Sequence, residues 1–182
     1  MKTIAVLIWL KVIVMILAVL VVLYLLMIMP RLTNRRERKK FLNVYYAHRG
    51  LHDNETDAPE NSMSAFRRAV EAGYGIELDV QVTKDKIPVV FHDFTLQRVC
   101  GQEGKVCDYT YEELQKFRLC KSSETIPLFE DVLKLVAGKV PLIVELKVEF
   151  TDLSVCEKAD ALLRKYKGLY CMESFNPLAV FW

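Results

Sequence analysis

Eighteen consecutive residues near the N-terminus, 12–29, carry no charged side chain. As a helix with about 1.5 Å of rise per residue, this run would be about 27 Å long, close to the hydrocarbon thickness of a bilayer. A cleaved signal peptide is the alternative, but the run is longer than the apolar part of such a peptide and no small-residue cleavage site precedes its polar boundary. The sequence therefore predicts a transmembrane helix over residues 1–30, ended by Pro30.

A basic juxtamembrane segment, residues 31–40, follows the predicted span. It contains six arginine or lysine side chains, whereas the other side of the span has only Lys2 and the N-terminal amine. Because basic flanks stay in the cytoplasm, we expect a single-pass membrane protein with its C-terminal domain in the cytoplasm. The five cysteines are odd in number and lack zinc-site spacing, so free thiols are expected there. The reverse orientation would allow a Cys100–Cys107 disulfide.

Charge excludes one class of partner for the remainder of the chain. Residues 41–182 hold 17 basic and 22 acidic side chains, a net charge of −5. Since nucleic-acid-binding domains are usually basic, no nucleic-acid partner is expected. The basic segment is better explained as a topology signal that also contacts anionic lipid headgroups.

Short apolar strands alternate with amphipathic helices after residue 40, which is typical of the α/β class with a parallel sheet. Strands are predicted over residues 44–47, 76–82, 87–91, 140–146 and 169–172. Helices are predicted from a cap at Asn61 or Ser62 to Gly73, from a capping box at Thr110 and Glu113 through Phe117, from Pro127 to Gly138, and over residues 154–166. The strand 76–82 alternates strictly, so its apolar residues share one face and its polar residues the other.

Three acidic side chains on predicted strands are candidate metal ligands. Glu77 and Asp79 are two residues apart and project from one strand face; without a cation they would repel, and their hard oxygens suit Mg²⁺ or Ca²⁺. A polar strand face in water is the alternative. Glu145 interrupts the apolar run 140–146, where a carboxylate without a partner is costly. A shared metal would supply that partner, and Lys147 could supply a counter-charge or a phosphate contact; a surface pair of Glu145 and Lys147 is the alternative.

Two histidines and an arginine stand where acid–base and anion chemistry could occur. His48 and His92 each end an apolar strand, the position that faces the active-site rim in α/β folds, and imidazole serves as acid or base near neutral pH. Arg49 could hold phosphate oxygens through its planar guanidinium, or form a salt bridge with Glu60 or Asp79. Glu60 could orient that arginine, approach the metal, or serve the helix entry.

Five motifs occur in the order His48-Arg49-Gly50, Pro59-Glu60-Asn61, Glu77-Leu78-Asp79-Val80, His92-Asp93 and Glu145-Leu146-Lys147. Taken together, this series resembles the glycerophosphodiester phosphodiesterase family. The resemblance implies a TIM barrel, which needs at least about 200 residues. Only 142 follow residue 40, so we expect residues 41–182 to be a partial domain, incomplete at its C-terminus, from a truncated gene product or fragment.

The same resemblance implies metal-dependent hydrolysis of glycerophosphodiesters to glycerol 3-phosphate and an alcohol through a cyclic phosphate. The implied acid–base pair is His48 and His92; Arg49 and Lys147 contact substrate; Glu77, Asp79 and Glu145 bind Mg²⁺ or Ca²⁺. Two alternatives remain at this point. One is a lysophospholipase D that acts on membrane lysolipids, and the other is an inactive, membrane-anchored fragment.

Overall fold

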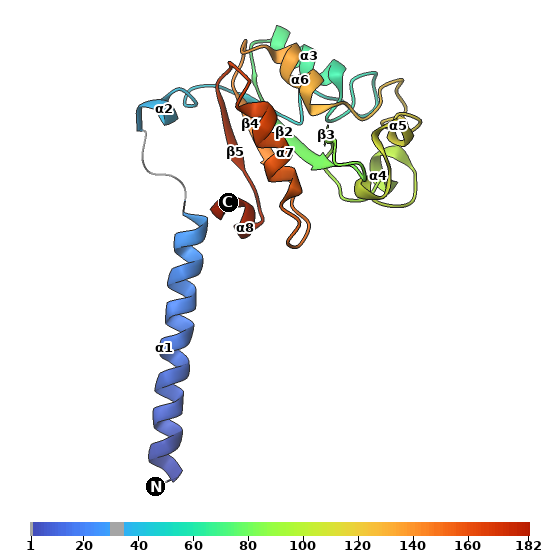
Figure 1. Ribbon diagram of the computed structural model, residues 1–182. Coiled ribbons are helices and arrows are strands. Elements are labelled where there is room, and N and C mark those ends of the chain that lie inside the picture. Colours follow the sequence, from blue (N-terminus) through green and yellow to red (C-terminus); the bar gives the residue numbers. More distant parts are fainter. Residues whose placement is uncertain (1, 30–34) are drawn as a thin grey trace.

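The computed structural model describes residues 2–29 and 35–182. It begins with the long helix α1 (Lys2–Ile28), which extends away from the folded domain (Figure 1). Within the described part of the chain, Val6–Ile28 is the one helical stretch long and apolar enough to cross a membrane. The predicted end of the span at Pro30, and residues 31–34 of the predicted basic segment, lie outside the described residues.

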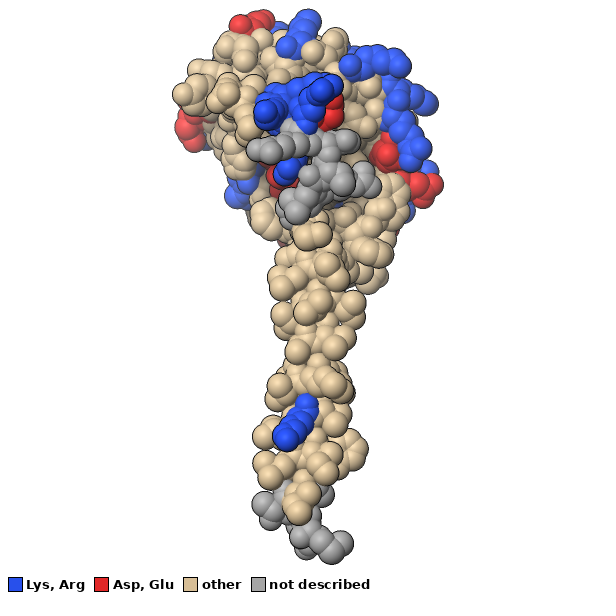
Figure 2. Space-filling view, turned by 90° about the vertical axis from the view of Figure 1, so that its left-hand side faces the viewer, with Lys and Arg blue, Asp and Glu red and all other residues tan. Residues whose placement is uncertain are grey.

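A short helix, α2 (Arg35–Lys39), precedes the domain and carries basic side chains in its last turn. Figure 2 shows the contrast in charge along the molecule: α1 is almost free of charged side chains, whereas basic side chains gather on the domain beside it.

The domain is built on one mixed sheet, which has five strands within the described residues. Its parallel strands lie in the order β1 (Tyr46–His48), β2 (Gly75–Val82), β4 (Leu142–Leu146) and β5 (Tyr170–Glu173). Strand β3 (Pro88–Val90) folds back antiparallel to β2. It pairs with β2 beyond the stretch that β1 occupies, so β1 and β3 share one edge of the same strand. The predicted α/β class with a parallel sheet is confirmed.

Three helices cover one face of this sheet: α3 (Met63–Glu71), α6 (Phe129–Val136) and α7 (Ser154–Leu163) (Figure 1). The alternation in β2 decides which face they cover, because Ile76, Leu78 and Val80 are fully buried in the core that these helices complete. Each such side chain contributes about 1.5–3 kcal/mol through burial. The opposite face is left to the polar residues of β2 and β4.

Helix starts follow the predicted caps more closely than helix ends follow the predicted stops. Ser62 caps α3, its hydroxyl accepting a hydrogen bond from the Ala65 N–H at 3.1 Å, which leaves the side chain of Asn61 free for another contact. The predicted capping box at Thr110 is present. However, α5 (Tyr111–Leu114) ends before Phe117, because Phe117 packs with Tyr109 in a second apolar cluster instead of continuing a helix.

The remaining elements are short. They are α4 (Gln97–Cys100), the 3₁₀ helix η1 (Val106–Asp108) and α8 (Pro177–Phe181). Helix α6 begins at Phe129, two residues after the predicted start at Pro127. All five cysteines are free in the structure, in agreement with the expected thiols.

Candidate active site

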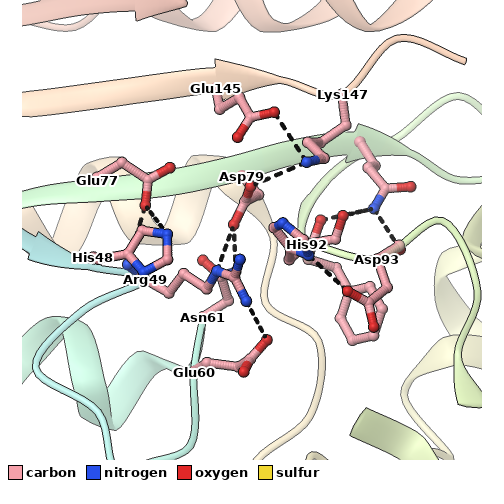
Figure 3. A network of polar contacts seen from close by, with 12 residues as sticks. His48, Arg49, Glu60, Asn61, Glu77, Asp79, His92, Asp93, Glu145 and Lys147 are labelled. Carbon is pink, nitrogen blue, oxygen red and sulfur yellow. Dashed lines mark hydrogen bonds and ion pairs between the residues drawn. The ribbon is translucent and has the colours of Figure 1, made fainter. Parts of the chain in front are cut away.

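Three carboxylates meet on the face of the sheet that the helices leave open. Oxygen atoms of Glu77, Asp79 and Glu145 all lie within 4.8 Å of one another. Register explains the meeting, since Asp79 of β2 pairs directly with Glu145 of β4, and Glu77 is two residues before Asp79 on the same face. Figure 3 shows the three side chains converging from the two strands. The sequence-based expectation that these three residues come together is confirmed, and a half-solvated strand face is excluded because Asp79 is fully buried.

Two cations stand beside the cluster. The ammonium of Lys147 is 2.9 Å from Glu145 Oε1 and 3.6 Å from Asp79 Oδ1, and Arg49 Nε is 3.6 Å from Asp79 Oδ2. The side chain of Lys147 is only 11% exposed, so the alternative of a surface pair with Glu145 is wrong. Three carboxylates are therefore offset by two cations, of which Arg49 is shared with another acid.

Backbone strain brings Arg49 and Asn61 into this cluster. Both have positive φ, 57° and 55°, a region that non-glycine residues seldom occupy and that is common at functional sites. The Asn61 N–H donates to the Arg49 carbonyl at 2.9 Å, which ties the two loops together. The Asn61 amide then donates to Asp79 Oδ2 at 2.9 Å.

The oxygens of this cluster fit a hard divalent cation. Asp79 Oδ1 and Asn61 Oδ1 are buried and have no hydrogen-bond partner among the described residues, although buried polar atoms normally have one. Carboxylate and amide oxygens are the ligands that Mg²⁺ and Ca²⁺ prefer. A cation bound by the three carboxylates would give Asp79 Oδ1 a partner and offset the excess of negative charge.

The excess of negative charge affects the pKa of Glu77. Burial and the negative charge of Asp79 raise the pKa of Glu77 to about 7, although its carboxylate accepts a hydrogen bond from the Arg49 N–H at 3.1 Å. Glu77 therefore ionises less readily than an ordinary glutamate, and a positive charge in the cluster would lower its pKa.

The two predicted histidines flank the carboxylates (Figure 3). His48 ends β1, and its Nε2 is 3.8 Å from Glu77 Oε2. Partial burial and the charge of Arg49 lower the pKa of His48. His92 reaches the site by another route, because β3 runs antiparallel and its last hydrogen bond, from the Phe91 N–H to the Asp79 carbonyl at 2.9 Å, sets the following residue beside the cluster. Of the two histidines, only His48 therefore lies at the carboxyl end of a parallel strand, and His92 follows an antiparallel one.

A chain of ion pairs links the two halves of the site. His92 Nδ1 lies 2.6 Å from Asp93 Oδ1, and Arg98 Nε donates to Asp93 Oδ2 at 2.7 Å. Arg98 also donates to both oxygens of Glu60, at 2.5 and 2.9 Å, and Glu60 accepts from Arg49 Nη1 at 3.1 Å. Glu60 therefore orients Arg49, which was one of its expected roles. Arg98 connects the arginine of the first motif with the histidine of the fourth.

Glu60 and Asp93, the two acids in this series of ion pairs, stay ionised near neutral pH. Burial would raise the pKa of Glu60, but the hydrogen bonds from Arg98 and Asn54 outweigh it and bring the pKa to about 2. Hydrogen bonds from Arg98 likewise lower the pKa of Asp93 to about 2. In the reverse direction, Glu60 and Asp93 raise the pKa of Arg98.

Four residues contribute to the site although the sequence predicts no place for them there. The helix-cap pattern predicts only capping for Asn61, and strand alternation predicts only an unspecified polar face for Gln81. The Gln81 amide donates to the carbonyls of Phe91 and Asp93, both at 2.7 Å, and so fixes the segment that carries His92. Arg98 lies on α4 without any sequence signal. Glu173 pairs in register with Glu145, and burial together with the charges of Glu145 and Asp79 raises its pKa; the strand order that places it there could not be read from the sequence.

Comparison with known proteins agrees with this geometry. Residues 48–174 match the model of the glycerophosphoryl diester phosphodiesterase family. A glycerophosphodiester phosphodiesterase of Bacillus altitudinis is 42% identical over 111 residues, covering 57% of this chain and 44% of the relative. Lysophospholipase D GDPD1 of Rattus norvegicus is 34% identical over 161 residues, covering 81% of this chain and 49% of the relative. The chain thus spans about half the length of these relatives.

A solved structure shows the same fold. An Oleispira antarctica phosphodiesterase, in complex with the product sn-glycerol-3-phosphate, superposes with a TM-score of 0.68 at 27% identity, covering 78% of this chain and 61% of the other. The parallel strands and their covering helices correspond to part of a TIM barrel. The matched segment contains every site residue described above. The sequence, the fold and the site therefore agree, and the chain belongs to the glycerophosphoryl diester phosphodiesterase family.

Proposed function

We propose that this chain hydrolyses glycerophosphodiesters to glycerol 3-phosphate and an alcohol with the help of a divalent cation. The observation that carries the proposal is the group of three carboxylate side chains within 4.8 Å, flanked by two histidines. Relatives that are glycerophosphodiester phosphodiesterases by name support this substrate class, and the product bound to the Oleispira antarctica structure supports this product.

Each polar group of the site has a role in this proposal. Glu77, Asp79 and Glu145 would hold Mg²⁺ or Ca²⁺, which supplies positive charge for the phosphate oxygens when bound. Arg49 and Lys147 would contact the same phosphate from either side of Asp79, to which both are paired. Their positive charges are placed before substrate arrives, so little reorganisation is needed.

His48 and His92 would move the protons. In the first step, one imidazole takes the proton of a free glycerol hydroxyl as its oxygen bonds to phosphorus, and the other imidazole protonates the alcohol oxygen as its bond to phosphorus breaks. This gives a cyclic phosphate. In the second step, the roles reverse: water attacks phosphorus, the ring bond breaks, and the glycerol oxygen takes the proton. The pair is therefore restored after each turnover.

The test is release of glycerol 3-phosphate from glycerophosphocholine with Mg²⁺ or Ca²⁺ by the full chain in detergent. His48→Ala and His92→Ala should each lower the rate by about 10²–10⁴-fold. The matched control is His52→Ala, since His52 is an exposed loop residue that the proposal gives no role. If wild type and both active-site variants are equally inert, this chain is the inactive, membrane-anchored fragment.

A lysophospholipase D is the second candidate, acting on membrane lysolipids. It is favoured by α1 and by the likeness to lysophospholipase D GDPD1 over 81% of this chain. The two substrates are separated by comparing kcat/KM for lysophosphatidylcholine and glycerophosphocholine with the chain reconstituted in vesicles. Preference for the lysolipid would replace the leading proposal.

We further propose that α1 anchors the domain as a single span with the domain in the cytoplasm. The basic residues of α2 on the domain side support this orientation. In sealed vesicles whose cytoplasmic face is inside, protease added from outside should leave the domain intact. A cleaved signal sequence would instead yield a shorter chain that is not bound to the membrane.

A further inference from the structure

Two exposed phenylalanines stand on loops at the mouth of the site. Phe150 lies between β4 and α7 with 81% of its surface exposed, and Phe175 lies between β5 and α8 with 91% exposed. Both loops follow the carboxyl ends of parallel strands, the end at which Glu145 and Lys147 also lie. We call this pair the phenylalanine rim.

Each phenylalanine of the rim is joined to the site by a cleft. One cleft, of about 300 Å³, is lined by Phe150, Phe94 and Lys147, and the other, of about 270 Å³, by Phe175, Phe94 and Lys147. A molecule whose phosphate reached Lys147 would therefore have apolar surface leading outward to the rim.

The rim lies on the same side of the domain as the proposed membrane anchor. Helix α8, which follows Phe175, contacts α1, and its Ala179 is buried in the core of the domain. Figure 1 shows the loop after β4 and the end of β5 on the side from which α1 extends. The mouth of the site would thus face the membrane that α1 crosses.

We propose that the phenylalanine rim enters the headgroup region of the bilayer that α1 crosses, so that the site opens onto the lipid surface. The proposal rests on the proposed role of α1 as a membrane anchor. Aromatic side chains are favoured at this depth, and an apolar group there enters about 5–10 Å into the boundary between headgroups and acyl chains. The partner that contacts the phenylalanine rim is phospholipid, and both side chains would be buried from water when α1 is in the membrane.

Fluorescence quenching by brominated lipid tests this contact without using catalysis. The chain has two tryptophans, Trp9 and Trp182, so Trp9→Phe with Trp182→Phe gives a background without tryptophan. Phe150→Trp and Phe175→Trp then place single reporters on the rim. Tyr45→Trp is the matched control, because Tyr45 is 84% exposed but precedes β1, at the opposite ends of the strands.

The chain is reconstituted in phosphatidylcholine vesicles with bromine near the top of the acyl chains. Emission from tryptophan at 150 and 175 should fall by about half or more at this depth, and emission at 45 should not change. Trp9, retained in the Trp182→Phe variant, reports insertion of α1. Quenching at Trp9 without quenching at 150 and 175 would overturn the rim while the anchor stands; no quenching at Trp9 would overturn both.

Discussion

Two groups of acidic side chains in this molecule, the loop acids Glu60 and Asp93 and the strand acids Glu77, Asp79 and Glu145, differ in how their charges are offset. Glu60 and Asp93 share Arg98, and each has a pKa of about 2. Glu77, in the strand cluster, has a pKa of about 7. Burial does not separate the groups, since Glu60 and Glu145 are 5% and 6% exposed. The number of cations separates them. The two loop acids are paired with Arg98 and Arg49, whereas the three strand acids have only Lys147 and a share of Arg49.

This difference in charge balance indicates that the two groups have different roles. The loop network, Arg49-Glu60-Arg98-Asp93-His92, is electrostatically complete and fixes the position of two candidate catalytic groups. The strand cluster carries a charge imbalance that folding alone leaves in place, which is what a site for a divalent cation requires. Substitutions should therefore act in opposite directions on stability in the two regions.

The largest effect is expected from Glu77→Gln. The amide keeps the shape but loses a charged ligand, so turnover of glycerophosphocholine should fall at least about 100-fold. Stability without metal should stay equal or rise, because repulsion with Asp79 is removed. Thermal unfolding with and without Mg²⁺ or Ca²⁺ measures this, and the metal-induced rise in Tm should shrink. A lower Tm in the absence of metal would mean that Glu77 holds the fold together.

Glu60→Gln should lower the free energy of unfolding by about 2 kcal/mol, since it removes the buried charge that Arg98 and Arg49 share and leaves them only Asp93 and Asp79 as charged partners. Urea unfolding monitored by circular dichroism gives the value. Glu55→Gln is the matched control, because Glu55 pairs with Lys121 on the exposed surface and its loss should cost less than about 1 kcal/mol. Equal losses in the two variants would contradict the comparison.

Acid should weaken the loop network only below pH 4.5, after Glu77 of the strand cluster has taken up its proton. The folded pKa of Glu60 is about 2, below its ordinary value of 4.5, so its contribution to stability is complete above pH 4.5 and is lost as the pH falls toward 2. This difference amounts to about 3 kcal/mol, reduced to about 2 because the partner Arg98 is 47% exposed. Wild type should lose this stability between pH 4.5 and 2, and Glu60→Gln should lose less over the same interval. Parallel curves for the two proteins would exclude Glu60 as the titrating group.

The strand cluster could be predicted from the sequence, whereas of the loop network only the pair of Arg49 and Glu60 could. Alternation over residues 76–82 fixed the shared face of Glu77 and Asp79, and the cost of burying Glu145 indicated its partners. Arg98 gave no such signal, because its contacts depend on how α4 folds over the loop that carries Glu60. The place of Glu173 likewise depends on β5 pairing with β4, a register that local pattern does not contain.

The smallest expected effect sharpens the comparison most, because it separates charge from geometry in the loop network. Arg98 donates four hydrogen bonds, two to Glu60 and two to Asp93. Lysine at this position would keep the positive charge but could not span both acids, so Arg98→Lys should cost only about 1 kcal/mol of stability. If the network positions His92, kcat should nevertheless fall about tenfold with KM little changed. Arg68→Lys, at an exposed pair with Asp57, is the control and should change neither. An unchanged kcat in Arg98→Lys would leave the loop network a structural tie, with the chemistry confined to the strand cluster and the two histidines.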